Sequence, residues 1–263
     1  MLSNIGNKAK EFLLDLYLSP VNKSTRLAMS VKNRILPNIQ HLKGLAFTID
    51  NLTKGSYPAK LVIDIGCFNG GTSIFFYKEL KDVKIIGFEP SKQSYEQALK
   101  NTADLPGIKI ENYAVSDVCG VTEFFVTDNK VSSSLSPLTG EDLRFNTQNV
   151  EKVEVITLDE YLRSNKLLEE KILAMKLDVQ GHELSVLKGA ENTLKKTLFV
   201  LTEQSNHDSY KGGTHYFDVD ELLRQNGFRL NNIFAPFSYD PFLYEFDALY
   251  INQSLYDQFS SGL

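Results

Sequence analysis

Three acidic residues stand where predicted β-strands end. Asp64 and Glu89 lie at the ends of the first two apolar runs after residue 60, and Asp178 lies at the end of a later one. The carboxyl ends of parallel strands meet at one edge of an open α/β sheet, and ligands bind outside that edge. A carboxylate at the end of the second strand, here Glu89, can accept hydrogen bonds from both hydroxyls of a ribose. The three acids therefore predict a site for a ligand that contains a nucleoside.

A glycine-rich turn, Gly66 to Gly71, follows the first of these runs and leads into a predicted helix. In dinucleotide-binding turns the second glycine lets the backbone approach a pyrophosphate, but Phe68 occupies that position here. This side chain argues against NAD and FAD, and the sequence has no Gly-Lys-Ser/Thr motif for a triphosphate. Adenosine without phosphate remains, and S-adenosylmethionine is the common ligand of this kind. Asp64 would then organise the turn and meet the ammonium of the methionine part.

Methyl transfer from a sulfonium to a hydroxyl requires a group that removes the proton of the acceptor. A carboxylate or an imidazole within hydrogen-bonding distance is the usual solution. The candidates at the carboxyl edge of the sheet are Asp178, His182, Glu203 and His207. His207 lies in a polar loop that suits contact with an acceptor, whereas we assign His41 and His215 as structural or surface residues.

A metal site is the alternative for this chemistry. Asp178 and Glu203, on neighbouring strand ends, could hold Mg²⁺, which prefers oxygen ligands and would acidify the acceptor hydroxyl. The only cysteines are Cys67 and Cys119, in no CxxC motif and no Cys–His cluster, so the sequence argues against structural zinc. We therefore expect no metal, with Mg²⁺ as the alternative.

The elements that must position these residues are short strands that alternate with longer helices. We expect strands at 61–65, 84–89, 108–112, 172–178, 198–203, 228–234 and 246–251. We expect helices at 72–80, 92–103, 182–196 and 217–226. Strands that are apolar almost throughout suit a sheet covered on both faces, as in parallel sheets with crossover helices. The predicted fold class is therefore α/β, with a Rossmann-like, doubly wound sheet.

The stretch between residues 113 and 170 departs from this alternation. We expect an extra strand at 121–126 and then a polar loop at 127–150, which contains three consecutive serines, a proline and a glycine. Loops of this length within compact domains are usually functional or disordered.

The charge is unevenly distributed along the chain. Residues 1–60 carry nine Lys and Arg against three Asp and Glu, whereas the remainder carries 19 against 30. An acidic body with no tryptophan and no basic stripe argues against nucleic-acid binding, which depends on neutralising phosphates. We expect residues 1–59 to form basic helices, at about 8–18 and 24–34, that cap the acceptor side, pack against a second subunit of a homo-oligomer or make weak contact with an anionic membrane.

The domain organisation and compartment follow from the same survey. We expect the main domain at 60–253 and a C-terminal tail at 254–263. No apolar run reaches the ~18–20 residues of a membrane span, and the N-terminus lacks the pattern of a signal peptide. The expected compartment is therefore the cytoplasm, where the two cysteines would be reduced.

Five blocks occur in order along the chain. They are Ile63-Asp64-Ile65-Gly66 with Gly70, Phe88-Glu89-Pro90, Ala114-Val115-Ser116-Asp117 with Gly120, Thr157-Leu158-Asp159-Glu160-Tyr161-Leu162, and Lys176-Leu177-Asp178-Val179-Gln180-Gly181-His182-Glu183 with Val186-Leu187-Lys188-Gly189-Ala190. With these blocks the chain resembles the FkbM-type S-adenosylmethionine-dependent methyltransferases over roughly residues 61–251. The last block is the most specific.

The resemblance implies a seven-stranded methyltransferase fold whose last strand is antiparallel. It also implies O-methylation, often of a sugar hydroxyl on a glycan, a glycolipid or a natural product. The cofactor-binding positions that it implies are Asp64, Gly66, Phe68, Asn69, Gly70, Glu89, Pro90, Ser116, Asp117 and Asp178. The chain departs from the family at Phe68, where Asn is more usual and Asn69 could compensate, and at Gln180, where many members have Glu and where an amide cannot act as a base.

Two other classes of function remain open at this point. The fold could keep a nucleoside site without turnover and serve as a catalytically inactive subunit, although the intact set of Asp64, Glu89 and Asp178 favours an enzyme. A NAD-dependent oxidoreductase would need a turn that admits a pyrophosphate, and Phe68 argues against this class.

Overall fold

The computed structural model describes residues 40–140, 144–239 and 242–260. The chain divides into two compact units, Met1–Gln40 and His41–Leu263, and the sheets described below belong to the second. The helices predicted at 8–18 and 24–34 lie outside the described residues. Helix α3, Gln40–Thr53, belongs to the second unit from His41 onwards. The boundary predicted after residue 59 would instead place this helix in the N-terminal segment. The limits of the domains stay a prediction.

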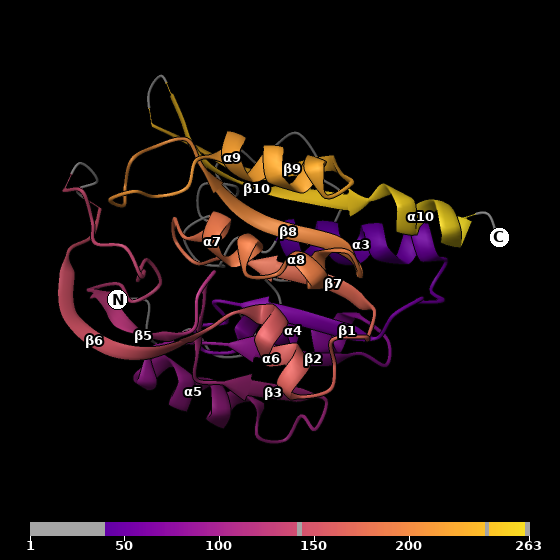
Figure 1. The fold of residues 1–263 in the computed structure, drawn as a ribbon, viewed down its shortest axis with the longest axis horizontal. Coiled ribbons are helices and arrows are strands. Elements are labelled where there is room, and N and C mark those ends of the chain that lie inside the picture. Colours follow the sequence, from indigo (N-terminus) through magenta and orange to yellow (C-terminus); the bar gives the residue numbers. More distant parts are fainter. Residues whose placement is uncertain (1–39, 141–143, 240–241, 261–263) are drawn as a thin grey trace, which may run out of the picture. The chain divides into compact units, whose positions relative to one another are not determined.

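A seven-stranded sheet forms the centre of the second unit, with the strand order β3-β2-β1-β7-β8-β10-β9 (Figure 1). The strands are β1 Leu61–Ile65, β2 Lys84–Phe88, β3 Ile108–Glu111, β7 Ile172–Leu177, β8 Thr197–Ser205, β9 Phe228–Tyr239 and β10 Phe242–Asn252. Strands β1, β2, β3, β7 and β8 are parallel, and β10 is antiparallel to both of its neighbours. The predicted α/β sheet with an antiparallel last strand is confirmed.

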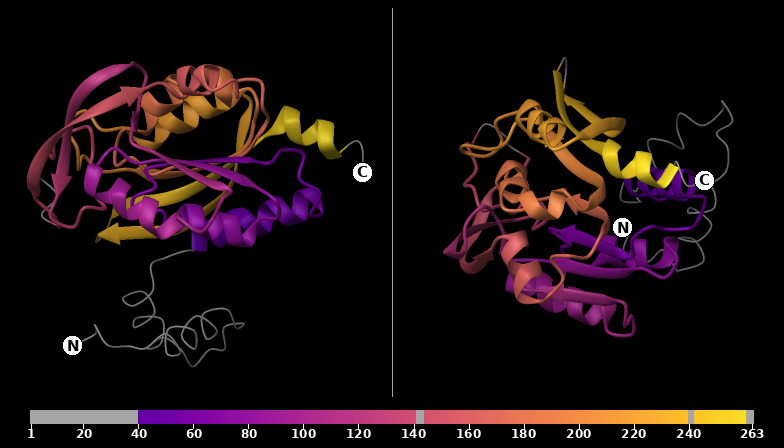
Figure 2. Two further views of the ribbon diagram at one scale, coloured as in Figure 1. Left: turned by 90° about the horizontal axis from the view of Figure 1, so that it is seen from below. Right: turned by 45° about the vertical axis from the view of Figure 1, so that its right-hand side comes forward.

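Helices cover both faces of this sheet, as its apolar strands predict. They are α4 Gly71–Glu79, α5 Lys92–Thr102, α6 Leu158–Ser164, α7 Glu183–Lys188, α8 Glu191–Leu194, α9 Tyr216–Gln225 and α10 Gln253–Ser260. In the left view of Figure 2, helices α3 to α5, in indigo to magenta, lie on one side of the sheet. The orange helices α7 and α9 lie on the other side.

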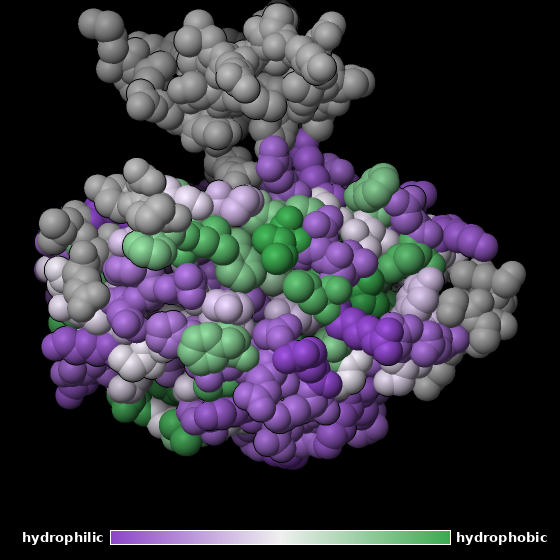
Figure 3. All heavy atoms as spheres, turned by 90° about the horizontal axis from the view of Figure 1, so that it is seen from above, coloured by the Kyte–Doolittle hydropathy of each residue, from purple (hydrophilic) through white to green (hydrophobic). Residues whose placement is uncertain are grey.

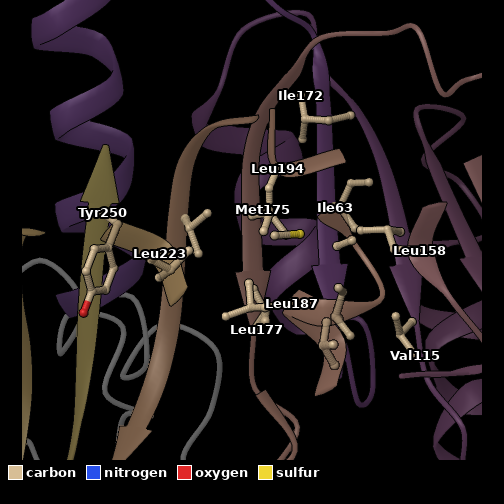
Figure 4. Close-up of a cluster of buried hydrophobic side chains, with 14 of the residues drawn as sticks. Ile63, Val115, Leu158, Ile172, Met175, Leu177, Leu187, Leu194, Leu223 and Tyr250 are labelled. Atoms are coloured by element: carbon tan, nitrogen blue, oxygen red, sulfur yellow. The ribbon is translucent and has the colours of Figure 1, made fainter. Parts of the chain in front are cut away.

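A large hydrophobic core lies between the sheet and helices α6 to α9. Met175 and Leu177 of β7 belong to the same buried cluster as Leu187 of α7, and Figure 4 shows them close together. Successive side chains of a strand point to opposite faces. Lys176, between two core residues of β7, therefore faces the α3–α5 side, and so does its partner in register on β1, Asp64.

A second, three-stranded sheet corrects the prediction for residues 127–150. It consists of β4 Ala114–Val115, β5 Gly120–Thr127 and β6 Thr147–Ile156, in the order β4-β6-β5. The extra strand predicted at 121–126 is β5, but the predicted loop ends too late, because β6 begins at Thr147. Only Val153 and Val155 of β6 are buried. The polar residues before them therefore hide the strand in the sequence.

The helix predicted at 182–196 is in fact two helices, α7 and α8, because the chain bends at Gly189 and Ala190. A Cβ atom at Gly189 would lie 1.9 Å from the carbonyl oxygen of Ser116, so this position tolerates only glycine. Asp159 of α6 accepts hydrogen bonds of 2.9 Å from the backbone N–H groups of Asn192 and Thr193 at the start of α8. The block Thr157–Leu162 therefore has a structural role, because its Asp159 links α6 to the start of α8.

The surface of this unit carries scattered apolar side chains. On the face shown in Figure 3, hydrophobic residues occur in separate patches among hydrophilic ones. Phe47, Val121 and Phe242 are each about two-thirds exposed. Apolar residues exposed singly are normal in soluble domains. Of the helices in the described ranges, none has the length and apolar character needed to cross a membrane.

Candidate active site

The glycine-rich turn connects β1 to α4 and is fixed to the ends of two other strands. Gly66 has a φ of 78°, and a Cβ atom there would lie 1.9 Å from the carbonyl oxygen of Asp178, so only glycine allows β1 and β7 to approach this closely. Its N–H donates to the carbonyl oxygen of Phe88 at 3.0 Å. Gly70 caps α4 with a φ of 80°. These contacts fix the turn at the carboxyl edge of the sheet.

Glu89 reaches from the end of β2 to this turn. Its Oε2 accepts a hydrogen bond from the backbone N–H of Phe68, and its Oε1 accepts one from that of Ser91, each at 2.9 Å. Burial raises the pKa of Glu89 to about 8, although the two backbone donors oppose the rise. Asn112 donates to the carbonyl oxygens of Glu89 and Pro90 and so fixes the backbone beside the carboxylate.

Asp64 is fully buried below the turn. Its Oδ2 accepts a hydrogen bond of 2.7 Å from the hydroxyl of Ser73, whereas its Oδ1 has no partner among the described residues. Burial raises the pKa of Asp64, against the attraction of the Lys176 charge. A buried carboxylate oxygen without a donor is costly and requires an explanation.

Asn69 and Phe68 take different parts in the turn. The side chain of Asn69 accepts a hydrogen bond of 3.1 Å from the N–H of Gly71, so it stabilises the start of α4. Phe68 has a φ of 50°, in the left-handed region that few side chains other than Asn favour. The structure therefore shows a backbone reason for the Asn that the resemblance implies at position 68.

Asp178 and Lys176 form an ion pair at the end of β7. The Nζ of Lys176, which is 4% exposed, donates to Oδ2 of Asp178 at 2.9 Å. Burial alone would lower the pKa of Lys176, but the charges of Asp178 and Asp64 raise it above its ordinary value. Burial would likewise raise the pKa of Asp178, but Lys176 holds it below the ordinary value. Asp178 is thus ionised, and 37% of its side chain is exposed at the edge of the sheet.

Gln180 links Asp178 to a second carboxylate, that of Glu203 at the end of β8. Its Nε2 donates to Oδ1 of Asp178 at 2.9 Å and also to Oε2 of Glu203. Its Oε1 accepts a hydrogen bond of 2.9 Å from the hydroxyl of Tyr210. Gln180 therefore orients both carboxylates, which is a role that the sequence did not reveal.

Glu203 and Asp247 lie opposite each other on β8 and β10. Burial and the nearby charge of Asp178 raise the pKa of Glu203 well above its ordinary value. The same two causes raise the pKa of Asp247 to about 7. Burial and the repulsion by Asp178 thus favour the protonated forms of Glu203 and Asp247.

His41 of α3 joins this cluster, although we assigned it from the sequence as structural or surface. Its Nδ1 lies 3.2 Å from Oδ2 of Asp247. Burial and the charge of Lys176 lower its pKa to about 4. A signal was present in the sequence: Leu45 and Ile49 follow His41 at intervals of four residues, which places all three on one face of the helix. Leu45 and Ile49 are both fully buried.

The predicted residues His182, Ser116 and Asp117 form a separate group. The Nε2 of His182 lies 2.9 Å from the hydroxyl oxygen of Ser116, which also donates to Oδ1 of Asp117 at 2.9 Å. Burial lowers the pKa of His182, against the attraction of Asp117. The structure thus places His182 with two predicted cofactor-binding residues, and its hydrogen bond does not go to Asp178.

The side chain of Glu183, next to His182, is 4% exposed. Its Oε1 accepts hydrogen bonds from the backbone N–H groups of Val179 and Gly181, at 3.3 and 3.2 Å. Burial raises the pKa of Glu183 to about 7. Glu183 therefore braces the turn that carries Gln180.

His207 lies beyond the end of β8 and packs against the β9–β10 hairpin. Its ring stacks on that of Tyr244, with the centroids 4.0 Å apart and an angle of 16° between the planes. Its Nδ1 lies 3.3 Å from the hydroxyl oxygen of Ser209. The stacking thus fixes the orientation of the His207 ring. Within residues 40–140, 144–239 and 242–260, no three His, Cys, Asp or Glu side chains are grouped to hold a metal ion.

Comparison with known proteins gives matches over the part of the chain that carries this site. A family model described as "Methyltransferase FkbM domain" matches residues 64–230, more than half of the chain. The 2-O-methyltransferase NoeI of Sinorhizobium fredii is 27% identical over 176 residues, which are 63% of this chain and 72% of that enzyme. The hexuronic acid methyltransferase AglP of Haloferax volcanii is 28% identical over 143 residues, 54% of this chain and 53% of that enzyme.

Solved structures with a similar arrangement of elements are more distant in sequence. The magnesium protoporphyrin IX methyltransferase of Synechocystis PCC 6803 is 12% identical, with a TM-score of 0.45 over 94% of this chain and 92% of that chain. The methyltransferase domain of METTL16 is also 12% identical, with a TM-score of 0.45 over 84% of this chain and 71% of that chain.

Proposed function

Because the chain belongs to the FkbM methyltransferase family, and is therefore an S-adenosylmethionine-dependent methyltransferase, we propose that its acceptor is a hydroxyl group of a sugar. The names of the relatives support an oxygen acceptor and a sugar: NoeI is a 2-O-methyltransferase, and AglP acts on a hexuronic acid. This chain spans about half the length of AglP. The sugar therefore stays a proposal for the whole protein.

The observation that carries the proposal is the meeting of Asp64, Glu89 and Asp178 around one turn, at the ends of three adjacent strands. S-adenosylmethionine supplies a methyl group on a positively charged sulfur, ready for displacement. The unpartnered Oδ1 of Asp64 suits the ammonium of its methionine part. Each oxygen of Glu89 already accepts one backbone hydrogen bond and keeps a lone pair for a ribose hydroxyl.

The residues Ser116, Asp117 and Pro90 complete the proposed cofactor side. The polar pair Ser116 and Asp117 follows β4 directly, and it contacts His182 rather than the acidic cluster. We assign this group to the adenine end of the cofactor. The assignment leaves the carboxylates around Asp178 for the methionine end and the acceptor.

On the acceptor side, the proposed role of Asp178 is to orient the hydroxyl. Its charge is fixed by Lys176, its direction is fixed by Gln180, and its side chain is partly exposed. An ionised carboxylate accepts a strong hydrogen bond from a hydroxyl, and this bond aims the oxygen at the methyl carbon. Correct alignment is a large part of the barrier in such a displacement.

We further propose that the reaction uses no metal and takes place in the cytoplasm. Lys176 already provides a fixed positive charge beside Asp178. Both cysteines are free, Cys67 in the core and Cys119 at the surface, as suits a reducing compartment.

The test is a screen with S-adenosylmethionine labelled in its methyl group. The acceptors are neutral oligosaccharides, uronic acid oligosaccharides and sugar nucleotides, with catechols and peptides as controls. We expect label in a saccharide and an equal release of S-adenosylhomocysteine. Cofactor binding without transfer to any acceptor would instead support an inactive nucleoside-binding subunit, and binding of NAD in its place would support an oxidoreductase.

A further inference from the structure

Helix α3 carries His41 to the acceptor side of the site from outside the matched family domain, which begins at residue 64. The helix is firmly placed: Leu45 and Ile49 are fully buried, and a Cβ atom at Gly44 would lie 2.3 Å from the ring of Phe234 on β9. His41 lies one turn before Leu45, on the same face. Its side chain is 16% exposed, so its position is fixed by packing.

The two ring nitrogens of His41 are in different situations. Nδ1 is buried and lies 3.2 Å from Oδ2 of Asp247, but no aligned hydrogen bond forms between them. Nε2 has no hydrogen-bond partner among the described residues. Roughly 90% or more of buried polar groups are paired, so the unpaired Nδ1 requires an explanation. Hydrogen bonds of catalytic groups are often poorly aligned until the substrate is bound.

The charges around His41 come from three strands. Lys176 and Asp178 face it from β7, Asp247 faces it from β10, and Glu203 lies beside Asp247 on β8. Because burial and Lys176 lower its pKa to about 4, His41 is neutral near pH 7 and can accept a proton. The pKa of Asp247 is raised to about 7, so its charge appears in the physiological range and then strengthens His41 as a base.

We propose that His41 is the base that removes the proton of the acceptor hydroxyl, and that Asp247 is its positioning residue. This inference rests on the proposed function. The O–H bond of the acceptor breaks, and the proton moves to Nε2 of neutral His41. The oxygen forms its bond to the methyl carbon as the carbon–sulfur bond breaks, and the electron pair of that bond stays on sulfur. The imidazolium then releases its proton to solvent. Asp178 keeps the orienting role.

The first experiment compares turnover in the full chain for His41→Gln and His41→Asn, with His215→Gln as the matched control. His215 also faces an aspartate, with its Nε2 3.0 Å from Oδ1 of Asp208, but outside the acidic cluster. We expect the two His41 variants to lose ~10²- to 10⁴-fold in kcat, the range for general acid–base catalysis. Their affinity for S-adenosylhomocysteine and the activity of the His215 variant should stay unchanged.

The second experiment follows kcat against pH. The wild-type rate should rise as the pH passes about 7, where Asp247 ionises. In Asp247→Asn this limb should disappear, since the amide cannot titrate. A merely structural role for Asp247 would lower the rate equally at every pH.

The third experiment needs no acceptor and no turnover. Imidazole NMR signals of His41 in the full chain should remain those of a neutral ring down to about pH 4, because that is where its pKa lies. In the wild type these signals should also shift with pH, with a midpoint at about pH 7, because Asp247 ionises there. In Asp247→Asn this shift should be absent. This measurement tests the neutral state of His41 and its coupling to Asp247 even if both His41 variants fail to fold.

Wild-type turnover in either folded His41 variant would overturn the inference and leave the proposed function standing. A His41 that titrates near the unperturbed value of about 6.5, with no response to Asp247→Asn, would overturn it as well. If the wild type transfers no methyl group to any acceptor, the proposed function fails and the inference fails with it.

Discussion

The cofactor half of the site, around Asp64 and Glu89, holds its carboxylates through donors that are part of the folded frame. Both oxygens of Glu89 accept backbone N–H groups, those of Phe68 and Ser91. Asp64 accepts a hydrogen bond from the hydroxyl of Ser73, at the start of α4. Backbone donors cannot rotate away, so the carboxylate of Glu89 keeps its position as long as the fold does.

The acceptor half, around Asp178, Glu203 and Asp247, depends instead on side chains. Asp178 is held by Lys176 and Gln180, and Gln180 is in turn the partner of Glu203. Several carboxylates lie near one buried ammonium, and burial together with the charge of Asp178 raises the pKa values of Glu203 and Asp247. A change of one side chain should therefore disturb the acceptor half more widely than the cofactor half.

The largest expected effect is on turnover in Asp178→Asn. Loss of the charged acceptor at this position should cut kcat by about 10²-fold or more, the scale for misplacing a reacting group. Affinity for S-adenosylhomocysteine should change little, because Asp64 and Glu89 remain in place. Titration of the cofactor product and single-substrate kinetics separate the two quantities.

Glu203→Gln is the matched comparison for that variant. Burial raises the pKa of Glu203 well above its ordinary value, whereas Lys176 holds the pKa of Asp178 below its own, so an amide removes less negative charge at Glu203 than at Asp178. Its effect on kcat should be much smaller than that of Asp178→Asn. Wild-type turnover in Asp178→Asn would remove Asp178 from the mechanism.

The next effect is on stability, in Lys176→Met. Removing one partner of a buried ion pair costs ~3–5 kcal/mol, and 37% exposure of the Asp178 side chain places the expected loss near the lower end. Urea denaturation of both proteins measures it. Lys109→Met is the control, because Lys109 pairs with Glu111 with 59% of its side chain exposed, where a pair is worth about 0–1 kcal/mol. Equal losses in the two variants would contradict a special role for Lys176.

The same contrast explains which features could be predicted from the sequence. The turn, Asp64 and Glu89 were found because glycines and acids next to apolar runs are local signals. Strand β6 was missed because its first residues are polar and exposed, and only its pairing with β5 makes it a strand. The helix predicted at 182–196 was not seen to break, because the cause is a close approach of Ser116, more than 70 residues earlier.

The acceptor half was less accessible to sequence reasoning for the same reason. Asp247 meets Glu203 only through the antiparallel register of β10 and β8. His41 enters through a helix that precedes the matched family domain. Neither distance along the chain nor residue type marks these contacts, although the spacing of Leu45 and Ile49 does mark the buried face of α3.

The cofactor half is tested by Glu89→Ala, which should weaken binding of S-adenosylhomocysteine by about 1.5–3 kcal/mol, the range for a hydrogen bond to a charged group. Ribose hydroxyls favour the ionised carboxylate. Since the pKa of Glu89 is about 8, wild-type affinity should fall as the pH drops below that value, and Glu89→Ala should lose this dependence. Calorimetry at several pH values measures both effects.

Glu111→Ala provides the control, since Glu111 ends the next strand, β3, and its carboxylate bonds to Tyr161. Its affinity for S-adenosylhomocysteine should equal that of the wild type. An unchanged affinity in Glu89→Ala would show that the ribose lies elsewhere.

The smallest expected effect is that of Phe68→Asn, compared with Phe68→Ala. Phe68 has a φ of 50°, and a left-handed backbone costs most side chains roughly 1–2 kcal/mol but costs Asn less, because its short polar group can bond locally. Ala keeps the backbone cost and removes the ring, so the difference between the two variants isolates the backbone term. We expect Asn to be more stable than Ala by ~1 kcal/mol or less in urea denaturation. Equal stability of the two variants would mean that the hydrogen bond from the N–H of residue 68 to Glu89 offsets the backbone strain at this position. The cofactor half would then tolerate a change of side chain at position 68 without loss of stability.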